Sequence, residues 1–336
     1  MSIIRLAVCF FVPLALIGCD QAISFSEKYQ AKVSSTELEQ FVRSVKDDLV
    51  FIEGGEFWMG DYGSLYGKEK LPYDSDKDSK PLHKVELSGY SVDRFKITNK
   101  NFQFYLRYND LALRVIGGGN QSTWEEINSM PDNPAHMDWY EAERYCNWLA
   151  SITDLPFALL TEAQWEYAAR SRGQFLMVAT DDGTYKATRA PSTEFDGSRG
   201  INISTSWDRE AFAKEMGWKT AEVTPLPVDR FPPNPIGLYA MSDNGLEWVQ
   251  DWYDPNYYQY SPVKDPQGPK KPVYKDYYGR DMKVARGQSY ANPAWGGGVN
   301  VHRTKAEPYG YVKNKGLVVL IAKTARCAVN SSKPVI

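Results

Sequence analysis

The first 18 residues of this 336-residue chain decide which part of it is available to fold. An apolar run from position 6 to position 16 follows a single basic residue, Arg5. The run is shorter than the roughly 20 apolar residues that a permanent membrane-spanning helix needs. A basic start followed by a short apolar stretch is typical of a secretory signal peptide. We therefore expect residues 1–18 to be a lipoprotein signal peptide that is removed before the remainder folds.

The segment LIGC at residues 16–19 resembles the bacterial lipobox, in which cleavage occurs directly before a cysteine that becomes lipidated. Lipid chains on Cys19 would hold the protein at a membrane surface and not across the membrane. Asp20 follows, and enteric lipoproteins with aspartate at this position resemble those kept at the inner membrane. The segment predicts a lipid-anchored protein on the periplasmic side. A plain signal peptide, or a short anchor with an incidental cysteine, is the alternative.

The predicted compartment determines how the other cysteines are interpreted. Cys9 is lost with the signal peptide and Cys19 is used for lipidation, which leaves Cys146 and Cys327. An oxidising periplasm favours a disulfide between them. Two buried free thiols are the alternative, because cysteine is commonly buried in protein cores.

The charge balance excludes one broad functional class. With 39 basic and 42 acidic residues the formal net charge is −3, so we expect no nucleic-acid partner. Hydrophobic residues at 43% and charged residues at 24% are typical of an ordinary globular domain. The aromatic content of 14% is high, and composition alone gives no reason for it.

The remainder of the chain is predicted to be one domain behind a tether. Residues 19–45 are expected to form the lipidated N-terminus, a polar spacer and a short helix that starts at TELE, a capping-box pattern at residues 36–39. In residues 46–332, short apolar runs between Gly, Pro and Asn predict short strands. Helices are predicted after Thr98, Asp138 and Thr161. These patterns predict a loop-rich α+β domain, in which residues 61–81, with their acidic run at 74–78, form a solvated insertion.

Six short segments of this domain carry distinctive motifs. In chain order they are VFIEGGEFWMG (residues 50–60), VDRFKITN (92–99), LLTEAQWEYAAR (159–170), PNPIGLY (233–239), NGLEW with DWY (244–253) and ARGQSY (285–290). Together they resemble the formylglycine-generating enzyme (sulfatase-modifying factor) family. Ala158 and Leu160 depart from that family's usual Arg and Pro, but the order of the segments agrees with it.

The resemblance implies an irregular fold related to C-type lectins. A core of this kind is rich in Trp and Tyr and poor in regular structure, which would explain the aromatic content. The resemblance also implies a disulfide between Cys146 and Cys327, which match positions that are bridged in family members. A bridge that closes so long a loop stabilises a fold by about 4–5 kcal/mol in the loop-entropy model.

The catalytic positions of the family are where this chain departs from it. The family's oxidases convert a sulfatase cysteine to formylglycine with copper(I), held by two cysteines five residues apart. Soft thiolates suit copper(I). Asn292 and Gly297 stand where these cysteines would lie, and neither supplies a thiolate. We therefore expect no catalytic residue, no copper and no formylglycine generation.

Structural calcium is a further expectation from the resemblance, because oxygen ligands suit Ca²⁺. Two sets of residues match family calcium sites, namely Asp243, Gly245 (through its carbonyl) and Glu247, and Asn202 with Ile203. At the first set, Ala240 replaces a usual Asn or Asp. The alternative is that Glu247 only accepts hydrogen bonds in the core.

Two functions follow from these expectations. The first is a periplasm-facing lipoprotein with a non-catalytic domain that binds a protein or, alternatively, a glycan, as an envelope-complex component or an immunity protein. The second is a periplasmic oxidase of the same superfamily with altered, cysteine-independent chemistry. The absence of the cysteine pair favours the first. Among the many tyrosines after Trp252, those from Tyr274 onward are the candidates for an exposed recognition surface.

Overall fold

The computed structural model describes residues 33–114, 121–187, 201–288, 298–309 and 323–335. Cys19 and Asp20, and likewise Asn292 and Gly297, lie outside the described residues. Among the described residues, no helix has both the length and the apolar character needed to cross a membrane.

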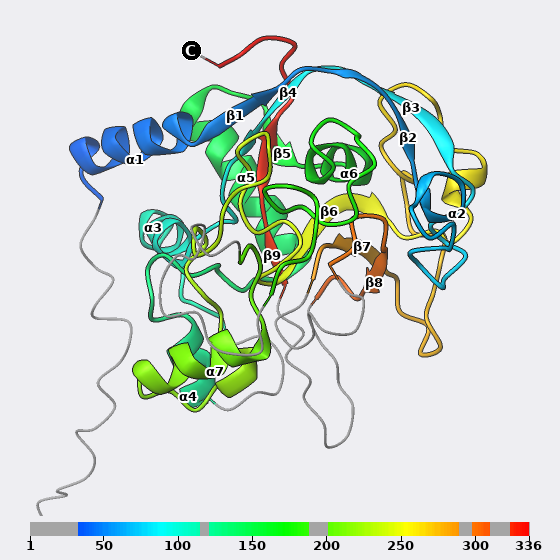
Figure 1. The fold of residues 1–336 in the computed structure, drawn as a ribbon. Coiled ribbons are helices and arrows are strands. Elements are labelled where there is room, and N and C mark those ends of the chain that lie inside the picture. Colours follow the sequence, from blue (N-terminus) through cyan, green and yellow to red (C-terminus); the bar gives the residue numbers. More distant parts are fainter. Residues whose placement is uncertain (1–32, 115–120, 188–200, 289–297, 310–322, 336) are drawn as a thin grey trace, which may run out of the picture.

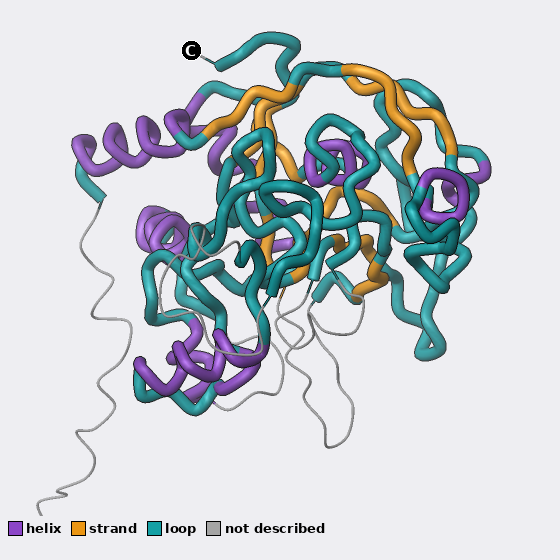
Figure 2. The backbone as a smooth tube through the Cα atoms, in the orientation of Figure 1, coloured by secondary structure: helices purple, strands orange, loops and turns teal. Residues whose placement is uncertain are grey.

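Helices and short strands are joined by long loops, so the predicted α+β class is confirmed (Figures 1 and 2). The helices are α1 (Ser35–Asp47), α2 (Gly63–Tyr66), α3 (Asn99–Tyr108), α4 (Gln121–Ile127), α5 (Trp139–Thr153), α6 (Glu162–Ala169) and α7 (Ser206–Glu215), with 3-10 turns η3 (Ala221–Val223) and η4 (Tyr257–Gln259). The strands are β1 (Leu49–Ile52), β2 (Gly55–Met59), β3 (His83–Leu87), β4 (Tyr90–Asp93), β5 (Phe157–Leu159), β6 (Leu246–Trp252), β7 (Lys283–Arg286), β8 (Thr304–Ala306), β9 (Lys323–Ala325) and β10 (Cys327–Val329).

The strands form three small sheets. One sheet has the order β1-β4-β10-β5, a second pairs β2 with β3, and the third has the order β8-β7-β6-β9. Strand β10 pairs antiparallel with both β4 and β5, and β9 pairs parallel with β6. Strand β10 therefore lies inside its sheet, between two strands from the first half of the domain, whereas β9 is the edge strand beside β6.

Side-chain caps explain where several helices begin. The helices predicted after Thr98, Asp138 and Thr161 are confirmed as α3, α5 and α6, and these three residues cap them with their side chains. The predicted capping box of α1 is wrong by two residues, because Ser34 Oγ accepts from the backbone N of Glu37 and the Glu37 carboxylate accepts from the backbone N of Ser34. Both pairs have the three-residue spacing of a capping box, so spacing alone does not choose between them.

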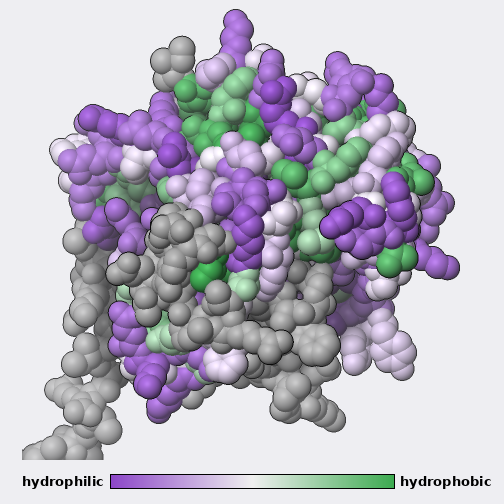
Figure 3. Space-filling model, viewed as in Figure 1, coloured by the Kyte–Doolittle hydropathy of each residue, from purple (hydrophilic) through white to green (hydrophobic). Residues whose placement is uncertain are grey.

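Two large apolar clusters form the core. One packs α3 and α5 around the disulfide, and the other packs α6 against strands of all three sheets. The Cys146–Cys327 disulfide joins α5 to β10, which confirms the implied pairing. Many core members are aromatic, and Trp165 and Trp248 are fully buried. On the face shown in Figure 3, hydrophobic residues are interspersed among hydrophilic ones.

The tyrosines after Trp252 divide only partly as expected, because Tyr260 is 58% exposed and Tyr274 is half-buried against the core. Tyr253, Tyr257 and Tyr258 are buried, whereas Tyr277 and Tyr278 are 96% and 63% exposed.

The insertion at residues 61–81 is solvated only in part: residues 64–66, 68–72 and 75–77 are exposed, whereas several others are buried. Asp74 and Asp78 are buried. The hydroxyl of Tyr253 donates to Asp78 Oδ2 (2.7 Å), and His302 Nδ1 lies 3.2 Å from Asp74 Oδ2. The burial of these two carboxylates was not predicted, because their partners come from distant parts of the chain and local composition carries no signal of them.

Candidate functional site

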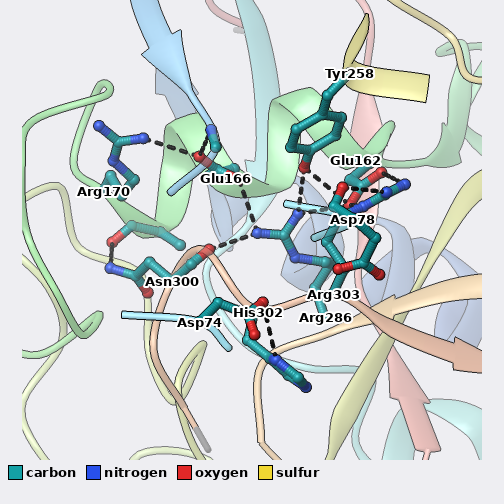
Figure 4. Close-up of polar contacts among 12 residues, drawn as sticks. Asp74, Asp78, Glu162, Glu166, Arg170, Tyr258, Arg286, Asn300, His302 and Arg303 are labelled. Carbon is teal, nitrogen blue, oxygen red and sulfur yellow. Dashed lines mark hydrogen bonds and ion pairs between the residues drawn. The ribbon is translucent and has the colours of Figure 1, made fainter. Parts of the chain in front are cut away.

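Helix α6 is buried along its whole length although it carries two glutamates, Glu162 and Glu166. Buried carboxylates need positive or hydrogen-bonding partners. Figure 4 shows that the partners gather from several elements, with Arg286 lying between the two glutamates and Arg303 beside Glu162. We call this set of side chains the buried arginine–glutamate network.

Glu162 is held by two arginines. Its Oε1 accepts from Arg286 Nη1 (2.7 Å) and from Arg303 Nε (2.7 Å), and its Oε2 accepts from Arg303 Nη2 (2.9 Å). Burial alone would raise the pKa of Glu162, but the charges of Arg303 and Arg286 outweigh it and hold that pKa below its ordinary value. Asp251, which accepts from the backbone N of Glu162, has its pKa raised to about 7 by burial and by the charge of Glu162.

Glu166 is held on both of its oxygens. Its Oε1 accepts from Arg170 Nη1 (2.8 Å) and from the backbone N of Gly60 (2.9 Å), and its Oε2 accepts from Arg286 Nη2 (2.9 Å). The network thus links α6 to the end of β2 and to β7. Each carboxylate is engaged by several donors, so the arrangement supports the fold.

A second buried cluster contains part of the predicted calcium site. Lys96 Nζ donates to Glu247 Oε1 (2.7 Å) and to the carbonyl of Gly245 (2.9 Å), and Arg326 donates to both oxygens of Glu247. Burial would raise the pKa of Glu247, but Arg326 and Lys96 lower it to about 2. The ammonium of Lys96 therefore already bonds both the Gly245 carbonyl and Glu247, and this pair of oxygens does not fit Ca²⁺ as it stands.

The other predicted calcium residues lie together elsewhere. Asn202, Ile203 and Asp243 border one cavity of about 20 Å³. Asp243 is ion-paired with Arg209, and the amide nitrogen of Asn202 donates to Asp181 Oδ1 (2.8 Å). The structure thus places Asp243 at the same cavity as the second predicted set. Calcium binding at this cavity stays a prediction.

No cluster of three or more His, Cys, Asp or Glu suited to a metal ion occurs in the part of the chain that the structure describes. The two cysteines in that part, Cys146 and Cys327, are joined to each other.

Sequence reasoning missed the cations of these clusters. Glu162, Glu166 and Arg170 follow one another at four-residue spacing on one face of a helix, and this spacing could have indicated a shared network. Lys96 and Arg326 gave no such signal, because their partner Glu247 is distant from both in the sequence.

Comparison with known proteins identifies relatives of this fold. Residues 34–319 match the model of the sulfatase-modifying factor enzyme 1-like domain. The formylglycine-generating enzyme of Streptomyces coelicolor is 27% identical over 278 residues, which cover 72% of this chain and 78% of that enzyme. A protein named serine/threonine-protein kinase pkn1, from Chlamydia pneumoniae, is 30% identical over 258 residues. That match covers 72% of this chain but 34% of the kinase, so this chain spans about one third of that relative's length.

Two solved structures share the fold. PvdO from Pseudomonas aeruginosa superposes with a TM-score of 0.56 at 22% identity, covering 84% of this chain and 93% of that one. Treponema denticola variable protein 1 superposes with a TM-score of 0.51 at 18% identity, covering 84% and 95%.

Proposed function

Because this chain belongs to the sulfatase-modifying factor enzyme 1-like domain family, we propose that it uses the family's fold as a non-catalytic binding domain. In this proposal, lipid on Cys19 displays the domain on the periplasmic side of a bacterial membrane. One observation carries the proposal, namely that the expected copper-ligand positions carry no cysteine and both cysteines of the described residues are bonded to each other. Asn292 and Gly297 stand at the expected ligand positions, and the disulfide uses the sulfurs of Cys146 and Cys327.

A pre-formed aromatic turn supports a binding role. The carboxylate of Asp276 accepts from the backbone N of Tyr278 (2.9 Å), from the backbone N of Arg280 (2.9 Å) and from the Arg280 side chain. Tyr277 and Tyr278 are presented to solvent on this turn, with their rings edge to face. Tyrosines offer large contact area at low entropic cost, and a turn that is already ordered loses little freedom on binding. We therefore place the protein partner, in an envelope complex or as a toxin to be neutralised, at this turn.

The test is capture of a partner by the full-length protein in detergent, after cross-linking in envelope extract. We expect a stable partner that the Tyr277→Ser, Tyr278→Ser double variant no longer captures. Trp207→Ser is the matched control, because Trp207 is 51% exposed on α7. Capture unchanged in the double variant would refute the assignment of this surface.

Metal analysis and oxygen uptake of the same preparation test the alternative function. We expect neither bound copper or iron in stoichiometric amount nor oxygen consumption. Stoichiometric redox metal together with oxygen uptake would overturn the binding proposal in favour of an oxidase with altered chemistry.

A further inference from the structure

A groove of about 490 Å³ is lined by residues of α5, β5, β6 and β7, outside the buried arginine–glutamate network. Its volume is in the range of small-molecule sites, roughly 300–1,000 Å³. Trp139 from the start of α5 and Trp252 from the end of β6 line it, and we call it the Trp139–Trp252 groove. Trp139 is buried, whereas Trp252 is partly exposed.

The aromatic wall of the groove is held in place from behind. The indole N–H of Trp139 donates to the carbonyl of Val249 (2.8 Å). Lys283, opposite Trp252 in the β6–β7 pairing, places its Nζ 3.6 Å from the ring centroid of Trp139 and 3.9 Å from that of Trp252. The same ammonium donates to the carbonyl of Gln250 (2.7 Å). The two indole rings are therefore fixed by cation–π and hydrogen-bond contacts before any ligand arrives.

Polar side chains line the rest of the groove. Asn147 is exposed and Glu143 is half-buried on α5, and within the described residues neither side chain makes a hydrogen bond. Gln250 and Gln267 contribute two more amides, joined to each other by a long contact of 3.4 Å, and Gln267 Nε2 also donates to the carbonyl of Asp265 (3.0 Å). Each amide offers both donors and an acceptor, and the carboxylate offers acceptors. The groove thus combines an aromatic wall with donors and acceptors that are accessible to solvent.

We propose that the Trp139–Trp252 groove is a saccharide-binding site, in which a sugar ring packs against Trp252 and its hydroxyls bond Asn147, Gln250, Gln267 and Glu143. A pyranose has an apolar face of C–H groups and a rim of hydroxyls that both donate and accept. That combination matches the lining, and the proposal does not depend on whether the domain is catalytic.

Other ligand classes fit the lining less well. A purely apolar ligand would bury the amides and Glu143 without partners, which is costly. A cationic ligand would meet Lys283 at the rings and Lys270 on the lining. Burial lowers the pKa of Lys283 to about 8, so its ammonium remains charged at neutral pH and repels other cations.

Isothermal titration of the full-length protein in detergent tests the proposal with three probes: triacetylchitotriose, cellotriose and trigalacturonic acid. These distinguish N-acetylated, neutral and acidic saccharides. We expect at least one to bind with a Kd below about 1 mM. Trp252→Ala should weaken that binding at least about tenfold, through loss of the stacking surface. Trp58→Ala is the matched control, because Trp58 is 46% exposed on β2 and lies outside the groove, and it should leave the Kd unchanged.

A second variant keeps the test decisive if Trp252→Ala does not fold. Asn147→Ala removes an exposed side chain with no hydrogen bond to lose within the described residues, so it should fold normally and weaken binding severalfold. Absence of binding by all three probes at up to about 10 mM would overturn the proposal. Binding that both groove variants leave unchanged would overturn it as well.

Discussion

The ammonium of Lys96 lies 2.7 Å from Glu247 Oε1, and both side chains are fully shielded from water. Lys96 belongs to the VDRFKITN segment and Glu247 to NGLEW, so the contact joins two of the motifs that identify the family. The same Nζ also donates to the carbonyl of Gly245. A protein cation thus neutralises the oxygens at which the resemblance implied calcium.

Removing the ammonium of this pair should be severely destabilising. Lys96→Met leaves Glu247 buried with only part of its positive partners, and breaking a buried ion pair from one side costs about 3–5 kcal/mol. Urea unfolding of the two proteins measures the difference. Lys84→Met is the matched control, because Lys84 lies 2.7 Å from Glu56 in an exposed pair and should change stability by less than about 1 kcal/mol. Equal losses in the two variants would contradict this account of Lys96.

Acid should destabilise the fold in a defined pH window. The pKa of Glu247 is about 2 in the folded protein against an ordinary 4.5, so the unfolded chain binds the proton more readily. The contribution of Glu247 is fully present above pH 4.5 and is lost as the pH falls toward 2, amounting to about 3 kcal/mol. Urea unfolding midpoints across this window measure it. Glu247→Gln should show a shallower pH dependence, and an unchanged slope would rule out Glu247 as the source.

The disulfide should contribute substantially to stability. It joins residues 181 positions apart, and the loop-entropy model predicts about 4–5 kcal/mol for such a loop. Guanidinium unfolding of a Cys146→Ala, Cys327→Ala double variant against the unmodified protein measures this contribution. A double variant as stable as the parent would show that the disulfide does not stabilise the fold by reducing the conformational entropy of the unfolded chain.

Local patterns predicted those parts of the fold that local chemistry determines. The caps at Thr98, Asp138 and Thr161 were predictable because a capping side chain bonds residues within its own first turn. The short helices α2 and α4, and also α7, were not predicted. Their residues lack strong apolar periodicity, so packing against the rest of the domain decides their conformation.

The contacts of site residues could be predicted only where a sequence motif of the family implied them. The pairing of Cys146 with Cys327 followed from the family resemblance. The partners of Glu247 did not, because Lys96 and Arg326 are brought to it by folding from positions 151 and 79 residues away. The burial of Asp74 could not be predicted from the sequence for the same reason, since its partner His302 is 228 residues away. Long-range charge pairing is the part of this structure that sequence patterns do not encode.

The most direct test of the central claim is mass spectrometry of a cysteine-containing sulfatase peptide after incubation with the full-length protein, copper(I) and oxygen. The formylglycine-generating enzyme of Streptomyces coelicolor serves as the positive control. Because Asn292 and Gly297 supply no thiolates, the account predicts that the peptide keeps its cysteine while the control converts it to the aldehyde. Conversion of the peptide by this protein would contradict the proposal that the domain is non-catalytic.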